Sequence, residues 1–135
     1  MRLLLDTCVV MDVFVRRNGY KESLNVLKYC EARKVEGLIT TAATMDVMRI
    51  LRKHMGVDKM RETLHNLFIV LSDLPIEGHD IYEAIADDML GCDRVVEMCC
   101  AKINKVDYII THNKKDYVNS PVPALLPSEI LPLLG

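Results

Sequence analysis

Residues 3–10 of the chain read LLLDTCVV, an apolar triplet that stops at an aspartate. Three consecutive leucines are typical of a strand covered on both faces, as the central strands of parallel sheets are. Asp6 and Thr7 are both residue types that cap helices, and the pattern after them predicts a helix to about Arg17. The segment therefore predicts a buried strand that leads directly into a helix.

The same alternation continues along the chain. Helical spacing of apolar residues predicts helices over about 20–30, 41–51, 59–71, 80–90 and 92–104, and a short last helix from residue 128. Strands are expected at 37–40, 71–76, 106–111 and 122–126, and prolines in the second and fourth of these are typical of an edge. Strands that alternate with helices predict an α/β sandwich around a mainly parallel sheet of four to five strands.

Length and composition limit the class of protein further. The 135 residues predict one domain over 1–135, and a net charge of −2 gives no overall attraction for nucleic acid. An anionic substrate would therefore need local cations or a metal ion. The longest apolar run, residues 67–71, is too short to span a membrane. Five cysteines without a Cys-x-x-Cys pair argue against disulfides or a zinc knuckle and favour the cytoplasm.

Carboxylates interrupt the hydrophobic pattern at several places. Asp46 borders the stripe of its helix that should face the sheet, and Asp93 lies directly on the apolar line of another helix. Asp6 ends a buried strand, and Asn113 and Asp116 follow the strand at 106–111. Ligands collect beyond the carboxyl ends of strands in parallel α/β folds, so these side chains share one edge if the two strands are neighbours.

Crowded carboxylates repel one another unless a cation neutralises them, and desolvation adds to this cost. Oxygen ligands without a His or Cys cluster predict Mg²⁺ or Mn²⁺, which orients phosphate and activates water for in-line attack. Hydroxyl and cationic side chains beside the same segments are expected to contact the substrate: Thr7, Arg16, Arg17, Thr111, Lys114 and Lys115.

Each of these residues also has an ordinary structural interpretation. Asp6 with Thr7 could only cap a helix, and Asp46 could serve the helix dipole. Asp93 could cap a helix that restarts after a break, and residues 113–116 could form a simple turn. Their joint fit to one edge of the sheet favours the functional interpretation.

At these residues the sequence resembles the PIN-domain family of metal-dependent nucleases. Four segments carry the resemblance: LLLDTCVV at 3–10, residues 41–51, CDRVVEMCCA at 92–101 and DYIITHNKKDY at 107–117. The last is similar to the family's strand followed by Thr-x-Asn-x-x-Asp-aromatic. The resemblance implies a three-layer α/β/α sandwich and an endoribonuclease that depends on Mg²⁺ or Mn²⁺. It also implies a small toxin of a toxin–antitoxin pair, with RNA as substrate, an antitoxin as partner and a homodimer as the usual assembly.

The resemblance also implies roles for individual residues. Carried over by position, the catalytic acids are Asp6, Asp46, Asp93 and Asp116, and the metal ligands are Asp6, Asp93, Asn113 and Asp116. Three positions depart from the family: Cys8 replaces an Asn, Asp46 a Glu, and Leu90 an Asp that close relatives often carry.

These departures leave open a catalytically degenerate PIN module that binds RNA or a protein partner without cleavage. A phosphatase with Asp6 as covalent nucleophile is disfavoured, because Cys8 stands where that chemistry needs a second acid. Val26, Tyr29 and Ile69 are expected off the inner faces of their helices, which together with the resemblance predicts a homodimer.

Overall fold

The computed structural model describes residues 1–17, 19–92 and 94–135. In these ranges five strands form a parallel sheet in the order β3-β2-β1-β4-β5. The strands are β1 (Arg2–Leu5), β2 (Glu36–Thr40), β3 (Ser72–Leu74), β4 (Tyr108–Ile110) and β5 (Ala124–Leu125). The helices are α1 (Thr7–Val15), α2 (Tyr20–Glu31), α3 (Thr41–Leu51), α4 (Val57–Val70), α5 (Gly78–Ala86), α6 (Val95–Ile103) and α7 (Pro127–Leu134), with a 3₁₀ helix η1 (Lys114–Tyr117). The predicted α/β class and parallel sheet are confirmed.

Strand β1 occupies the centre of the sheet, as its sequence predicts. It pairs with β2 on one side and with β4 on the other, so that Leu4 lies opposite both Leu38 and Ile109. Leu3, Leu4 and Leu5 are all buried, because helices cover both faces of the sheet at this point. The two strands expected to be neighbours, those that end before Asp6 and Thr111, are therefore adjacent.

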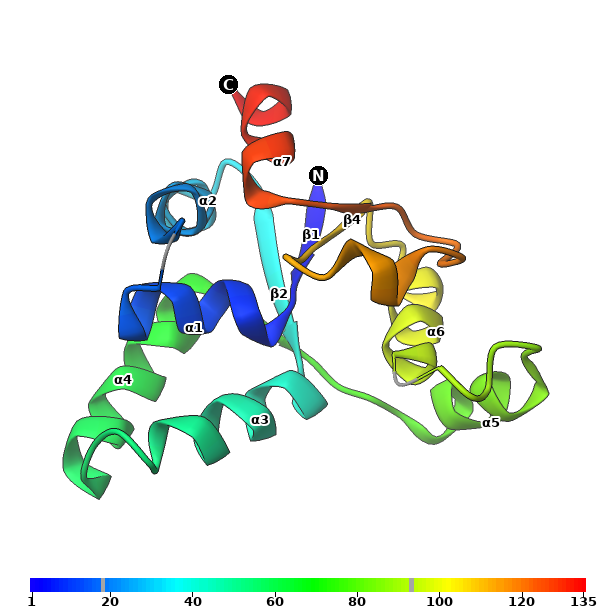
Figure 1. Ribbon diagram of the computed structural model, residues 1–135, viewed down its shortest axis with the longest axis horizontal. Coiled ribbons are helices and arrows are strands. Elements are labelled where there is room, and N and C mark those ends of the chain that lie inside the picture. Colours follow the sequence, from blue (N-terminus) through cyan, green and yellow to red (C-terminus); the bar gives the residue numbers. More distant parts are fainter. Residues whose placement is uncertain (18, 93) are drawn as a thin grey trace.

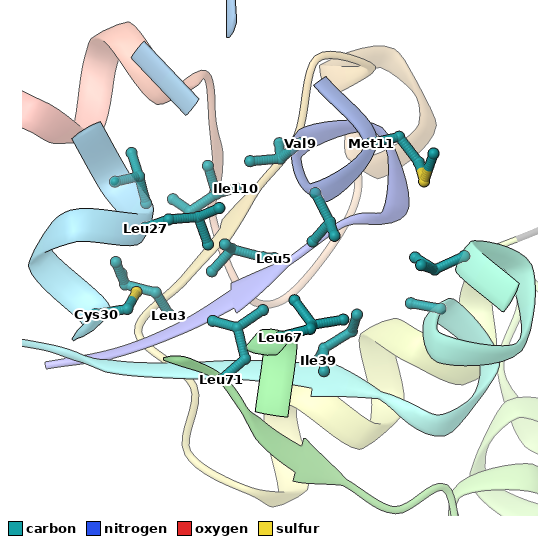
Figure 2. Close-up of a cluster of buried hydrophobic side chains, with 14 of the residues drawn as sticks. Leu3, Leu5, Val9, Met11, Leu27, Cys30, Ile39, Leu67, Leu71 and Ile110 are labelled. Carbon is teal, nitrogen blue, oxygen red and sulfur yellow. The ribbon is translucent and has the colours of Figure 1, made fainter. Parts of the chain in front are cut away.

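Helices cover the two faces of the sheet unequally, which completes the three layers (Figure 1). The larger core holds Leu3 and Leu5 together with residues of α1, α2, α3, α4 and α7. Figure 2 shows part of it, with Leu5 and Ile110 of the sheet near Val9 of α1 and Leu27 of α2. The smaller core packs Leu4 and other sheet residues against α6, which α5 contacts from outside.

Two local expectations need adjustment. Helices α5 and α6 are shorter than the predicted ranges 80–90 and 92–104, since α5 ends at Ala86 and α6 begins at Val95. The proline-containing strands do lie at the sheet edges. Pro123 precedes β5 rather than interrupting it, and its carbonyl accepts a hydrogen bond from the Ile109 N–H at 2.9 Å.

The last helix changes the surroundings of α2. Helix α7 packs against α2, and Val26 is completely buried in the larger core. The expectation that Val26 lies off the inner face is therefore wrong, because α2 is covered from more than one side. Ile69 on α4 is 61% exposed, as expected. None of the helices in the described ranges combines the length and apolarity that crossing a bilayer requires.

The approach of α2 and α4 to the sheet depends on Gly37 in β2. A Cβ atom at this position would lie 2.6 Å from both Cys30 Sγ and Leu71 Cδ2. We expect Gly37→Ala to lower the free energy of unfolding by roughly 1–3 kcal/mol, as overpacking of a closed core does. Urea denaturation measures this change. Gly78→Ala is the matched control, since its Cβ would meet only Tyr82 at 4.0 Å, and unchanged or higher stability is expected there. Equal stability of the two variants would contradict a rigid contact at Gly37.

Candidate active site at the carboxyl edge of the sheet

Asp6 is the central residue of the candidate site. It follows β1 directly and is only 3% exposed. Its Oδ1 accepts a hydrogen bond from the Thr7 N–H at 2.9 Å, and its Oδ2 accepts one from the Thr111 hydroxyl at 2.8 Å. The interpretation as a helix cap is confirmed, because Asp6 is the N-cap of α1. The same carboxylate also faces the segment that follows β4, so the capping and site interpretations hold together.

The residues after β4 are tied to Asp6 through a chain of hydrogen bonds. The Thr111 hydroxyl oxygen, which donates to Asp6, accepts from the Asn113 N–H at 3.0 Å. The Asn113 carbonyl in turn accepts from the Asp116 N–H at 2.9 Å, at the start of η1. The predicted meeting of Asp6 with this segment at one edge of the sheet is therefore observed. Thr111 is completely buried, whereas Asn113 is exposed.

A cavity of about 260 Å³ opens between α1 and α3 next to this edge. Its lining consists of Thr7, Cys8, Met11, Arg17, Asp46, Arg49, Ile50 and Arg94. Asp46 lies in the middle of α3, so it does not serve the dipole at the start of that helix. Its Oδ1 accepts a hydrogen bond from Arg49 Nη1 at 2.7 Å. The cavity thus brings three predicted residues, Thr7, Arg17 and Asp46, together with two arginines that the sequence analysis did not single out.

Glu97 on α6 is a buried acid that the sequence analysis missed. It is 7% exposed, and its Oε1 accepts a hydrogen bond from Arg94 Nη1 at 3.1 Å. Burial raises the pKa of Glu97, Arg94 partly opposes this rise, and the charge of Asp6 adds to it. A signal was present in the sequence, since Glu97 is the one charged residue in the run VVEMCCA at 95–101.

The negative charge of Asp6 also affects other groups around it. Burial is the main cause that raises the pKa of Tyr117, and the charges of Asp6 and Glu97 raise it further. Burial and then Asp6 raise the pKa of the Cys8 thiol as well. For Arg94, burial works to lower the pKa, but Asp6 and Glu97 more than compensate and keep the guanidinium charged. The surroundings of Asp6 therefore disfavour further negative charge and favour a cation.

The residues predicted as metal ligands or catalytic acids carry oxygen donors of the kind that a hard divalent cation binds. Asp6, Asp46 and Asp116 offer carboxylate oxygens, and Asn113 offers an amide oxygen. In the described ranges, no three His, Cys, Asp or Glu side chains lie together in a group that could hold a metal ion. Asp93, the remaining predicted ligand, lies outside the described residues. Mg²⁺ typically binds through one or two carboxylates plus water and substrate phosphates, so it does not require a group of three acids.

Other predicted residues lie further from the cavity. Asp116 and Lys115 line a separate hollow of about 360 Å³ together with Cys92, whose thiol donates to the Asp116 carbonyl at 3.5 Å. Lys114 Nζ lies 3.0 Å from Glu129 Oε2, in an ion pair near the start of α7. Arg16 is the left-handed C-cap of α1, with φ of 49°, and is exposed. Their roles toward substrate stay predictions.

Comparison with known proteins identifies similar folds and the family of this chain. No curated protein matches the sequence. Among solved structures, the chain is similar to a chain of VapBC2 from Rickettsia felis bound to a DNA fragment from its promoter, with 12% identity and a TM-score of 0.69. It is also similar to a chain of a toxin–antitoxin complex from Klebsiella pneumoniae, with 21% identity and a TM-score of 0.71. Each match covers 93% of this chain. The first covers 98% of the Rickettsia felis chain and the second 97% of the Klebsiella pneumoniae chain. At such low identities the matches show the fold alone.

The sequence itself matches the family model described as PIN domain over residues 2–115. This range includes β1, the cavity between α1 and α3, and residues 111–115 after β4, and it ends one residue before Asp116. The chain therefore belongs to the PIN domain family.

Proposed function

We propose that this chain is a divalent-metal-dependent endoribonuclease that hydrolyses RNA phosphodiester bonds. The observation that carries this proposal is the buried Asp6 carboxylate, held at the carboxyl edge of the sheet beside a cavity lined by three arginines. Membership in a family of nucleases supports it. Similarity in fold to chains of two toxin–antitoxin assemblies supports a role as the toxin of such a pair. Five unpaired cysteines are in keeping with action in the reducing cytoplasm.

The proposed roles of the acids are those that the resemblance to the family implies. Asp6 and Asp93 would hold Mg²⁺ or Mn²⁺, and Asn113 or Asp116 would complete the ligand set directly or through water. When bound, the cation supplies charge neutralisation of the scissile phosphate and activation of a water molecule. The chain fixes Asp6 for this task through the Thr7 N–H and the Thr111 hydroxyl. Asp46 would be a further ligand or would orient the attacking water.

The arginines around the cavity would hold the RNA backbone. Arg17, Arg49 and Arg94 line the same space, and guanidinium groups match phosphate oxygens with paired donors. Arg49 and Arg94 each already donate to a carboxylate, which limits their rotation and leaves their other N–H groups free for phosphate. Thr7 would contribute a hydroxyl group from the cavity wall, while Arg16, Lys114 and Lys115 would contact more distant phosphates. Thr111, predicted as a substrate contact, is completely buried and donates its hydroxyl to Asp6, so it holds Asp6 and does not reach the RNA.

The metal requirement can be tested with Asp6→Asn. Asn caps a helix about as well as Asp, since its single oxygen can accept from the Thr7 N–H. Its NH2 group then donates to Thr111 Oγ1 in place of the bond that Thr111 gives to Asp6, and a buried charge is removed, so we expect metal-free stability to hold. Stabilisation by Mn²⁺ and RNA cleavage should fall together, because a neutral amide is a poorer ligand. For the unaltered chain, Mn²⁺ at 100 times its Kd should add about 2.7 kcal/mol to the free energy of unfolding. Thermal denaturation with and without Mn²⁺, and cleavage of a labelled single-stranded RNA, measure both effects.

Asp58→Asn is the control for this experiment, since Asp58 is exposed on α4 and pairs with Arg61. It should leave metal stabilisation and cleavage unchanged. Cleavage by the purified chain that persists in EDTA would overturn the metal mechanism. RNA binding without any cleavage, in the presence of Mn²⁺, would instead support the degenerate PIN module.

The proposed RNA contacts can be tested with Arg17→Ala and Arg49→Ala. Loss of a phosphate contact should weaken binding about equally for different RNA sequences and lower the slope of log K against log salt by about 1. Arg61→Ala is a closely matched control: its side chain is 62% exposed and paired with an Asp three residues before it, as Arg49 is at 63%. Fluorescence anisotropy at several salt concentrations gives the slopes. Equal slopes for all three variants would place the RNA elsewhere.

Exposed apolar surfaces support association with partners. On α4, Val57, Phe68 and Ile69 are exposed beside a hollow of about 310 Å³, and on α5 Ile81 and Ile85 are exposed. Figure 1 shows α4 and α5 at opposite ends of the molecule. Two separate surfaces suit two partners, a second copy of the chain and an antitoxin.

We therefore expect light scattering of the isolated chain to give twice the 15.4 kDa of one copy. Phe68→Lys on α4 and Ile85→Lys on α5 each place a charge in one surface. The variant that shifts the mass to a monomer identifies the surface between copies, because a desolvated unpaired charge opposes association. A monomer mass that does not change with concentration in the unaltered chain would contradict the homodimer.

A further inference from the structure

A buried polar cluster joins three segments that are far apart in the sequence. Asp12 of α1, Ser23 of α2 and His112 after β4 meet in it. Asp12 Oδ2 accepts a hydrogen bond from the Ser23 hydroxyl at 2.9 Å and is also in hydrogen-bond contact with His112 Nε2. Asp12 is 3% exposed and Ser23 is completely buried, while about a third of the His112 side chain is exposed.

The order of these contacts excludes a hydrolytic triad. In such a triad the imidazole lies between the hydroxyl and the carboxylate and removes the hydroxyl proton. Here the carboxylate of Asp12 is the shared acceptor, and Ser23 Oγ is 3.5 Å from the same imidazole nitrogen. A completely buried Ser23 also cannot reach a substrate. The cluster therefore binds segments of the chain to one another.

His112 belongs to the segment that supplies Asn113 and Asp116. The preceding Thr111 is anchored to Asp6 at the start of α1, and His112 is anchored to Asp12 within the same helix. Six residues of helix separate these two anchors by about 9 Å. The His112 N–H also donates to Cys8 Sγ at 3.5 Å, but Cys8 lies near the Asp6 end of the helix. The contact with Asp12, further along the same helix, therefore adds the distant point that fixes the orientation of the segment.

The position of Asp12 has a cost in stability. It interrupts the apolar run VVMDVFV at 9–15, where an apolar side chain would pack into the core. Replacing a buried, paired charge together with its partner by apolar residues is often neutral or stabilising. Apolar residues at these positions would stabilise the fold at least as well, so stability alone does not account for the cluster.

We propose that Asp12, Ser23 and His112 form a positioning clamp that orients residues 111–116 for metal binding at Asp6. This inference rests on the proposed function. Residues that orient metal ligands through a second layer of hydrogen bonds typically change metal affinity 10- to 100-fold when they are replaced. The clamp acts through position, and none of its three residues touches the substrate.

The test compares three variants of the full chain. Asp12→Leu combined with His112→Leu removes the charge and its partner together, so no unpaired carboxylate remains in the core. The hydroxyl of the buried Ser23 can then donate to a carbonyl one turn earlier in α2, as helical serines do. His112→Gln keeps a side-chain N–H that can donate to Asp12, and His54→Leu is the control at an exposed histidine after α3. Calorimetry measures the affinity for Mn²⁺, thermal denaturation measures metal-free stability, and hydrogen exchange measures the opening of residues 111–116 without metal.

For the double variant we expect unchanged or higher metal-free stability, faster exchange at residues 111–116 and at least tenfold weaker Mn²⁺ binding. His112→Gln should retain most of the affinity, and His54→Leu should retain all of it. Unchanged Mn²⁺ affinity and unchanged exchange in the double variant would overturn the clamp. If the unaltered chain itself does not bind Mn²⁺, the proposed function fails, and exchange at residues 111–116 still decides whether the clamp orients this segment.

Discussion

The burial of one carboxylate at the end of the central strand is the constraint on which the rest of this structure depends. An unpaired charge at the depth of Asp6 costs several kcal/mol, so the fold must supply donors around it. The start of α1 supplies a backbone N–H, and Thr111 supplies a hydroxyl from the other half of the sequence. The second donor is present only because β4 lies beside β1. Sheet order and the placement of Asp6 are thus parts of the same arrangement.

The same burial sets the electrostatic character of the edge. Glu97 and Tyr117 lie close enough to Asp6 that their pKa values rise through its charge as well as through their own burial. Arg94 forms an ion pair with Glu97, and the charges of Asp6 and Glu97 raise the pKa of Arg94. This edge therefore has buried oxygen atoms on one side and arginines that line the neighbouring cavity on the other.

The sequence predicted those features that depend on local pattern. Mainly apolar runs at 3–5 and 106–111 identified strands β1 and β4, and Asp6 was identified as a helix cap. Packing contacts between distant helices were not predicted. Val26 is buried because α7 returns to α2, and no local pattern encodes that contact.

In the candidate site, too, local pattern identified single residues but not the contacts that they make. Asp12 and Glu97 each interrupt an apolar run of the sequence. The partner of Asp12, His112, comes from a distant segment. The partner of Glu97, Arg94, lies one helical turn before it, and the sequence did not show which side of that helix faces the core. Arg49 could not be assigned to the cavity because its position depends on how α3 packs against α1. Asp93, which the sequence placed in the metal site, lies outside the described residues.

The parallel order of the sheet determines when the edge around Asp6 can exist during synthesis. Strand β2 follows β1 after about thirty residues, whereas Asp6 and Thr111 are separated by 105 residues. Strands β1, β2 and β3 can pair while the chain is still emerging from the ribosome, but contacts of such high sequence separation form late. A chain interrupted before β4 keeps the central aspartate and lacks its second donor. The arrangement of hydrogen bonds around Asp6 is therefore complete only after the ribosome has synthesised β4 and Thr111.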